Sequence, residues 1–127
     1  MELNEVTENI IGAAIEVHRT IGAGLLESVY EECLCYELAL RGISFKKQYT
    51  VSLAYKDIAL DADYKLDLYV EDAVVVELKT VEKLLPIHDA QILTYMKLVE
   101  SSVGLLINFN VPYLIQGIKR KDLVFKE

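Results

Sequence analysis

The spacing of apolar residues changes once along this chain, and that change limits the folds that it can adopt. From about Asn4 to Thr20, and again from Leu26 to Leu38, apolar residues recur every three or four positions, as on one face of a helix. Gly22 and Gly42 follow these two stretches, and glycine commonly stands just after a helix. From Tyr49 to Tyr55 every second residue is apolar, which is typical of a strand. Two helices are therefore expected before the first strand.

The remainder of the chain predicts further strands and one more helix. Short polar turns bound two extended stretches, 60–70 and 73–80, and Pro86 suits the first turn of a helix that continues to about residue 100. A short apolar strand is expected at 103–109 and a last edge strand at 123–125. Hairpins followed by a helical crossover predict an α/β (α+β) fold with a mixed central sheet flanked by helices.

Length and charge narrow the functional classes. A chain of 127 residues suits one domain, so residues 1–127 are expected to form a single unit. The formal net charge of −7 disfavours a protein that binds nucleic acid over its whole surface, so any such contact must use a local patch. The acidic start of the chain and the interrupted apolar stretch 101–118 predict neither a secretory signal nor a membrane span. Cys33 and Cys35 suit packed, reduced thiols in a cytoplasmic protein.

Two charged residues end the apolar stretch VVVELKT at residues 74–80. Glu77 and Lys79 are two apart, so on a strand they share one face. Asp67 lies on the preceding strand, and a turn at Glu71–Asp72 places it at a depth similar to that of Glu77. Two facing carboxylates resist ionisation unless a cation lies between them, and Mg²⁺ prefers such ligands. The spacing equally allows exposed carboxylates with Lys79 paired to one of them, and both interpretations stay open at this point.

Two of the predicted helices carry further candidates. Glu27 lies one turn from Tyr30, at the margin between helix and core. There it can reach the acidic pair or remain an exposed glutamate in the first turn of its helix. Gln91 and Tyr95 form one stripe with His88, and their side chains suit hydrogen bonds to a phosphate oxygen or a water. His88, close to a helix start, is expected to be structural.

The stretch GLLESVY at residues 24–30 carries a recognisable motif. It matches the signature of the GxxExxY-motif protein family, and the sections DLYVED, VVVELKTVEKL, HDAQILTYMKL and VGLLINFNVP resemble that family in the same order. The resemblance spans roughly residues 7–112. Members of the family are similar to the PD-(D/E)XK nuclease superfamily, whose core has the order αβββαβ. The resemblance therefore implies a restriction-endonuclease-like fold preceded by an additional N-terminal helix.

This resemblance also implies an active site and an activity. It makes Asp67, Glu77 and Glu27 metal ligands and Lys79 the catalytic lysine. Gln91 and Tyr95 match the motif on the helix that follows the strand with Glu77 and Lys79. Leu66 stands where many superfamily members have proline. The implied reaction is hydrolysis of phosphodiester bonds in DNA, or in RNA, by a water activated by Mg²⁺ or Mn²⁺. The active-site residues that the resemblance implies are Glu27, Asp67, Glu77, Lys79, Gln91 and Tyr95.

Nucleic acid is the partner that this interpretation requires, with DNA favoured over RNA and no membrane. A local rim of lysines must then contact phosphates, unless a homodimer or a partner protein supplies the charge. The alternative function is a catalytically silent nuclease-like module that acts as a subunit or regulator of another protein. The lysines available for such a rim are Lys46, Lys47, Lys56, Lys65, Lys83 and the stretch Lys119–Lys121.

Overall fold

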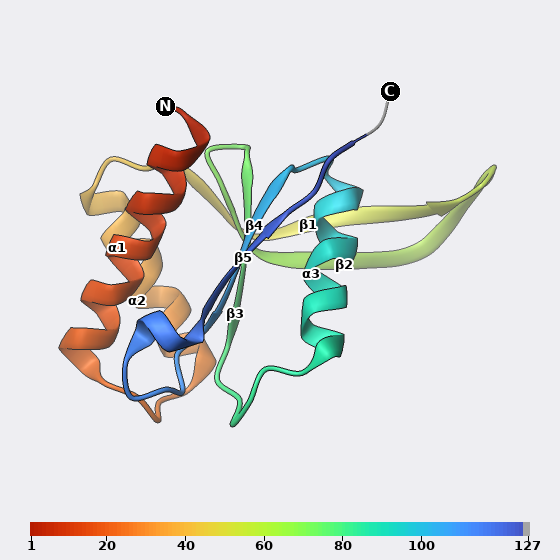
Figure 1. The fold of residues 1–127 in the computed structure, drawn as a ribbon. Coiled ribbons are helices and arrows are strands. Elements are labelled where there is room, and N and C mark those ends of the chain that lie inside the picture. The colour runs from red at the N-terminus through yellow and green to blue at the C-terminus, as the bar shows by residue number, and fades with distance from the viewer. Residues whose placement is uncertain (126–127) are drawn as a thin grey trace.

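A central sheet with helices on both faces forms the protein (Figure 1). The computed structural model describes residues 1–125, and within them three α-helices accompany a five-stranded sheet. This order confirms the predicted fold, including the additional N-terminal helix. The elements are α1 (Leu3–Ile21), α2 (Glu27–Leu40), β1 (Phe45–Tyr55), β2 (Ile58–Val70), β3 (Val74–Lys79), α3 (Pro86–Leu98), β4 (Val103–Asn108), the 3-10 helix η1 (Leu114–Gly117) and β5 (Ile118–Asp122).

The sheet has the order β1-β2-β3-β4-β5 and is mixed, as predicted. The pairs β1–β2, β2–β3 and β4–β5 are antiparallel, whereas β3 and β4 are parallel and are joined by α3. A parallel pair needs such a crossover because its strands start at the same edge. Both β3 and β4 are buried almost throughout, as expected for central strands covered on both faces.

The two faces of the sheet hold separate hydrophobic cores. Helices α1 and α2 cover one face and α3 covers the other (Figure 1). Val74, Val76 and Leu78 pack on the α1–α2 side, while Val75 packs on the α3 side, which is the alternation expected of a regular strand. By the same alternation Glu77 and Lys79 belong to the α3 side of β3.

The two edge strands differ from the sequence-based expectation. β5 occupies Ile118–Asp122, so the predicted last strand at Leu123–Phe125 was wrong. β1 begins at Phe45, four residues before the predicted Tyr49. Both corrections add charged residues to strands, and an edge strand tolerates these because its outward side chains meet water. No helix within residues 1–125 is long and apolar enough to cross a membrane.

Candidate active site

The strands β2 and β3 separate where their acidic residues begin. Their ladder pairs Val70 with Val74 and continues to the pair Leu68–Val76. Beyond that pair, side chains replace the ladder: the backbone N–H of Asp67 donates to Glu77 Oε2 (3.2 Å), and the N–H of Leu78 donates to Asp67 Oδ2 (2.8 Å). The backbone groups freed by the separation are thus satisfied by the two carboxylates. We call this place, formed by Asp67, Glu77 and Leu78, the strand fork.

A local reversal in β2 produces the fork. Leu66 packs on the α3 side of the sheet, yet Leu68, two residues later, packs on the α1–α2 side. Residues two apart share a face in a regular strand, so β2 must twist sharply at Asp67. The residue opposite, Gln48 of β1, has a positive φ of 50°, and its side-chain amide donates to Glu31 of α2 (2.6 Å). The sequence pattern gave no sign of this reversal.

Glu77 is buried, which excludes the interpretation of Glu77 and Lys79 as a solvated surface pair. Its side chain is only 4% exposed. Burial, followed by the negative charge of Asp67, raises the pKa of Glu77 to about 9, although Lys79 acts in the opposite direction. A carboxyl in this position remains protonated at neutral pH unless positive charge is brought to it.

The side chain of Lys79 is held by α3, the helix that packs on the same face of the sheet. Its Nζ donates to Gln91 Oε1 (3.4 Å), and Gln91 Nε2 donates to the hydroxyl of Tyr95 (3.2 Å). Burial, and then the charge of Glu77, raise the pKa of Tyr95, so this phenol stays neutral and serves as a hydrogen-bond partner. The predicted stripe on α3 thus faces the predicted lysine. His88, the third member of the stripe, instead accepts a bond from Leu85 N–H at Nδ1 (2.9 Å) and is structural.

Glu27 approaches the fork from the first turn of α2. The surrounding protein, and then the charge of Asp67, raise the pKa of Glu27, whereas the charge of Lys79 lowers it. Glu27 therefore lies within electrostatic reach of both residues while its side chain still meets solvent. The structure brings all six predicted site residues to one region of the molecule.

Tyr30 fixes the start of α2 and so the position of Glu27. Its hydroxyl donates to Gly22 O (2.6 Å) and accepts from Leu25 N–H (3.2 Å), which secures the loop between α1 and α2. Its ring stacks on Phe109 with centroids 4.4 Å apart and is fully buried. The sequence placed Tyr30 in the core but did not reveal this role.

Asn108 was not identified from the sequence as part of the site. It is buried at the end of β4, where it pairs with Lys79 in the parallel register. Its Oδ1 accepts from Val81 N–H (3.1 Å) and its Nδ2 donates to Val81 O (2.9 Å). These bonds fix the chain just after Lys79. An asparagine that ends an otherwise apolar strand is the sequence signal for this role, because a buried amide needs hydrogen-bond partners.

The carboxylates at the fork have the chemistry of a divalent cation site. Asp67 and Glu77 both offer carboxylate oxygens as metal ligands, and each uses one oxygen to accept a hydrogen bond from a backbone N–H. Mg²⁺ is often bound through one or two carboxylates together with waters. In the part of the chain that the structure describes, no group of three or more His, Cys, Asp or Glu side chains is arranged to hold a metal ion. The pair fits such an ion, and the assignment of Asp67, Glu77 and Glu27 as ligands stays a prediction.

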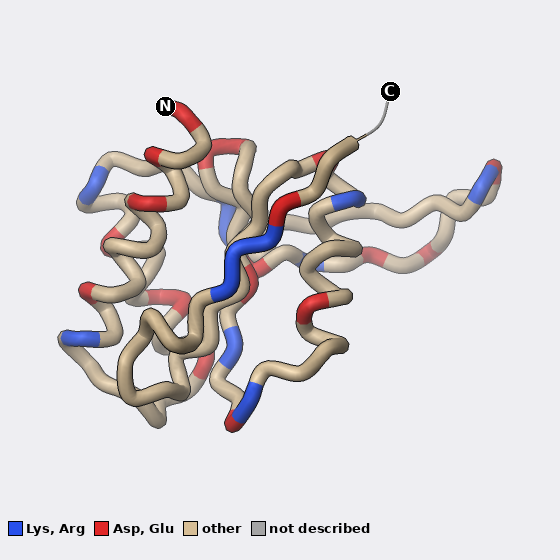
Figure 2. The backbone as a smooth tube through the Cα atoms, in the orientation of Figure 1, with Lys and Arg blue, Asp and Glu red and all other residues tan. Residues whose placement is uncertain are grey.

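The lysines expected to form a rim are distributed over the molecule. Figure 2 shows basic segments on β5, at the tip of the β1–β2 hairpin and in the loop between β3 and α3. Several of them have acidic partners: Lys46 Nζ lies 2.8 Å from Asp72, and Lys119 and Lys121 both bind Asp89 (3.6 and 2.7 Å). These lysines therefore do not form one continuous rim around the fork.

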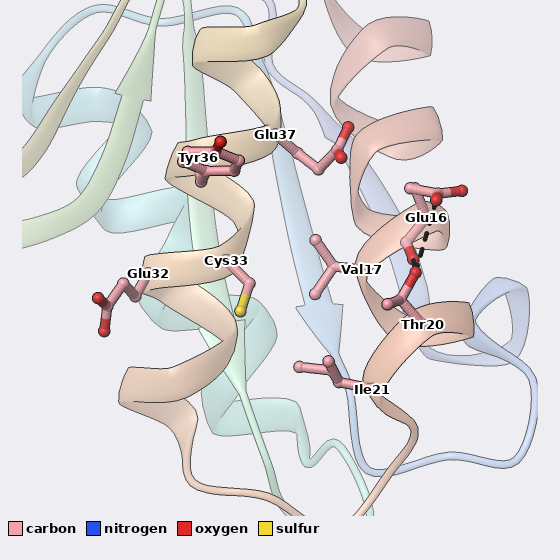
Figure 3. Close-up of a pocket in the computed structure, with 8 residues that line it drawn as sticks. All are labelled: Glu16, Val17, Thr20, Ile21, Glu32, Cys33, Tyr36 and Glu37. Atoms are coloured by element: carbon pink, nitrogen blue, oxygen red, sulfur yellow. Dashed lines mark hydrogen bonds between the residues drawn. The ribbon is translucent and has the colours of Figure 1, made fainter.

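A separate cavity between α1 and α2 is not part of this site. Its volume is about 320 Å³, and Figure 3 shows Val17, Ile21 and Cys33 pointing into the space between the two helices, with glutamates around it. None of the six predicted site residues lines it. It lies on the helical layer opposite α3, so we place the candidate active site at the strand fork.

Comparison with known proteins gives one match. The family model described as the PD-(D/E)XK nuclease superfamily matches residues 4–121, which is nearly the whole chain. No curated protein and no solved structure matches the chain. The narrower resemblance to the GxxExxY-motif family was not tested by this match and stays a prediction.

Proposed function

Because this chain belongs to the PD-(D/E)XK nuclease superfamily, we propose that it is a Mg²⁺- or Mn²⁺-dependent nuclease that hydrolyses phosphodiester bonds in DNA. The observation that carries this proposal is the strand fork. Reciprocal bonds between Asp67 and the Glu77–Leu78 segment bring two carboxylates together, with Lys79 on the same face as Glu77. A merely structural sheet has no need to bury one acid beside another, because each raises the cost of ionising its neighbour.

Each residue has a role in this proposal. Asp67 and Glu77 would hold the cation, and Glu27 would bind water at its margin. Lys79 would hold the attacking water or a phosphate oxygen through Nζ. Gln91 fixes the direction of that ammonium group, and Tyr95 fixes Gln91 in turn. The roles of Tyr95 and Gln91 are therefore positional, and those of Asp67, Glu77 and Lys79 are direct.

The reaction is a displacement at phosphorus. The water oxygen forms a bond to phosphorus, the bond to the leaving oxygen breaks, and the products are a phosphate monoester and a free hydroxyl. When bound, a divalent cation supplies the positive charge that offsets the phosphate and favours ionisation of water. Lys79 adds one further positive charge on the same side. The sum of Glu27, Asp67, Glu77 and Lys79 at full ionisation is −2, which one such cation neutralises.

A cleavage assay tests the proposal. Labelled single-stranded and double-stranded DNA and RNA are incubated with the protein in Mg²⁺, in Mn²⁺ and in chelator. We expect cleavage in the metal buffers, none in chelator, and loss of cleavage in Asp67→Asn and Lys79→Ala. Asp63→Asn is a matched control, because Asp63 lies on the same strand, is exposed and should leave the rate unchanged.

Equal trace activity in the wild type and in both site variants would refute the catalytic proposal and favour the silent interaction module. The finer expectations of the sequence, namely DNA rather than RNA, a cytoplasmic location and a homodimer or partner protein, stay predictions alongside it.

A further inference from the structure

A groove opens next to the candidate active site, between α3 and the β1–β2 hairpin. The hairpin extends past α3 and away from the rest of the sheet (Figure 1). The groove has a volume of about 330 Å³ and is lined from the hairpin by Leu53 and Tyr64. Its other wall is α3, including Ala90, Gln91 and Tyr95. A groove of this size is comparable to the smaller sites that bind organic ligands.

The groove and the active site share two residues. Gln91 and Tyr95 line the groove, and the same two side chains continue from Lys79 by hydrogen bonds of 3.4 and 3.2 Å. The ring of Tyr64 follows Tyr95, with centroids 6.3 Å apart and planes inclined by 46°. The series Lys79, Gln91, Tyr95 and Tyr64 therefore leads from the point where a phosphate would be held into an aromatic-lined recess.

The lining suits a neutral aromatic ring and not a second phosphate. No Lys, Arg, Asp or Glu lines the groove among the described residues. Tyr64 is 42% exposed, so part of its side chain is accessible to a ligand. Nucleobases stack on such aromatic faces with little regard to sequence, because every base has one. A nucleobase attached to the phosphate at the fork is the aromatic group that the proposed substrate brings to this place.

We propose that the groove receives one unpaired nucleobase adjacent to the phosphate that is cleaved, so that single-stranded or locally unpaired nucleic acid is the preferred substrate. The inference rests on the proposed nuclease function. In an intact duplex the faces of a base are covered by its stacked neighbours and its edge by its partner, so the base cannot enter. A single strand or an unpaired position presents the base without that cost.

Equilibrium binding tests the inference apart from catalysis. A short fluorescein-labelled single strand and the corresponding duplex are titrated with the protein in Ca²⁺ buffer, and anisotropy is recorded. The wild type is expected to bind the single strand more tightly than the duplex. Tyr64→Ala should weaken single-strand binding about ten- to hundredfold, the loss typical of removing one stacking partner, and should not weaken duplex binding.

Matched variants separate stacking from a general change in the hairpin. Tyr64→Phe retains the ring and should bind the single strand within about twofold of wild type, since stacking needs no hydroxyl. Tyr55→Ala removes another exposed tyrosine of the same hairpin that does not line the groove, and should have no effect. If Tyr64→Ala fails to fold, Ala90→Leu decides the question, because it fills the groove from an exposed helical position with a good helix former.

Several results of the binding experiment would overturn the inference. They are single-strand binding by Tyr64→Ala and Ala90→Leu equal to that of the wild type, a wild-type preference for duplex, and no binding of either nucleic acid. A wild-type dimer that Tyr64→Ala dissociates would also overturn it, because a second copy would then cover the groove.

The outcome for the nuclease proposal is read separately. Metal-dependent cleavage by the wild type, together with an unchanged substrate preference in Tyr64→Ala, would overturn this inference and leave the nuclease proposal standing. Loss of single-strand binding in Tyr64→Ala without any cleavage by the wild type would overturn the nuclease proposal and leave the groove only as a binding site for an unpaired nucleobase.

Discussion

Replacing Glu77 by glutamine is expected to stabilise the metal-free protein at neutral pH and to abolish its response to divalent cations. Glu77 is 4% exposed, and burial together with the charge of Asp67 raises its pKa from 4.5 to about 9. Glutamine has the shape of the protonated carboxyl, keeps an acceptor for the Asp67 N–H and does not ionise. The substitution therefore retains the form of Glu77 that the metal-free fold prefers.

The magnitude follows from the difference in pKa. Below pH 4.5 the carboxyl is protonated in both the folded and the unfolded chain, so it has no effect on their balance. Between pH 4.5 and about 9 the unfolded chain ionises while the folded protein holds the proton, and the free energy of unfolding falls by about 1.4 kcal/mol per pH unit. At about pH 7.5 this loss is roughly 4 kcal/mol, which Glu77→Gln should recover as a rise in Tm of roughly 15 °C.

Thermal unfolding in chelator at acidic and neutral pH provides the measurement. The gain from Glu77→Gln should be small near pH 4.5 and large near neutral pH, and Mg²⁺ or Mn²⁺ should raise the Tm of the wild type but not that of the variant. Glu8→Gln, at an exposed position on α1, is the matched control and should change neither quantity. A variant less stable than wild type at neutral pH, or a gain that does not depend on pH, would refute the reasoning.

Other consequences are open to measurement in the same protein. Because the cation must displace a proton from Glu77, metal affinity by calorimetry should rise about tenfold per pH unit and level off at about pH 9. The measured binding enthalpy should vary with the ionisation enthalpy of the buffer that takes up this proton. Tyr30→Phe should lower the free energy of unfolding by about 1 kcal/mol in denaturant titrations, since two hydrogen bonds to its hydroxyl are lost. Asn108→Ala should lower the free energy of unfolding by about 2 kcal/mol and speed hydrogen exchange at Val81, because the Asn108 amide bonds to both the N–H and the carbonyl of Val81. Gln91→Leu should slow cleavage about 10- to 100-fold with folding intact, because the ammonium group of Lys79 loses its direction.

Periodicity was sufficient for the order of elements and for the approach of the two acids. Apolar spacing separates helices from strands because each buries a different set of positions, and a hairpin turn fixes which residues of two strands lie at the same depth. Asp67 and Glu77 meet for that reason, and the α3 stripe meets Lys79 because the crossover helix packs on the same face.

The strained part of the site was not accessible to such patterns. Periodicity assumes a regular strand, whereas β2 reverses its faces between Leu66 and Leu68 and Gln48 adopts a positive φ opposite Asp67. Long-range contacts accompany this reversal, such as the bond from Gln48 to Glu31, and no local pattern records them. The burial of Glu77 on the central strand depends on packing between distant segments as well, and for that reason the sequence left the surface-pair interpretation open.

The error at the last strand has a different origin. The stretch Leu123–Phe125 was chosen because it is apolar, but the backbone partner of β4 is the charged stretch Ile118–Asp122. Pairing at an edge is decided by backbone hydrogen bonds and register, and charged side chains there help to prevent further pairing. Hydrophobicity alone is therefore a poor guide at the margin of a sheet.

The most direct test of the central claim, that the strand fork holds a divalent cation between Asp67 and Glu77, is a calorimetric titration of Mn²⁺ into the metal-free protein slightly above neutral pH. We expect a saturable site in the wild type and in Asp63→Asn, and its loss in Asp67→Asn. Absence of binding in the wild type, or binding of equal strength in folded Asp67→Asn, would contradict it.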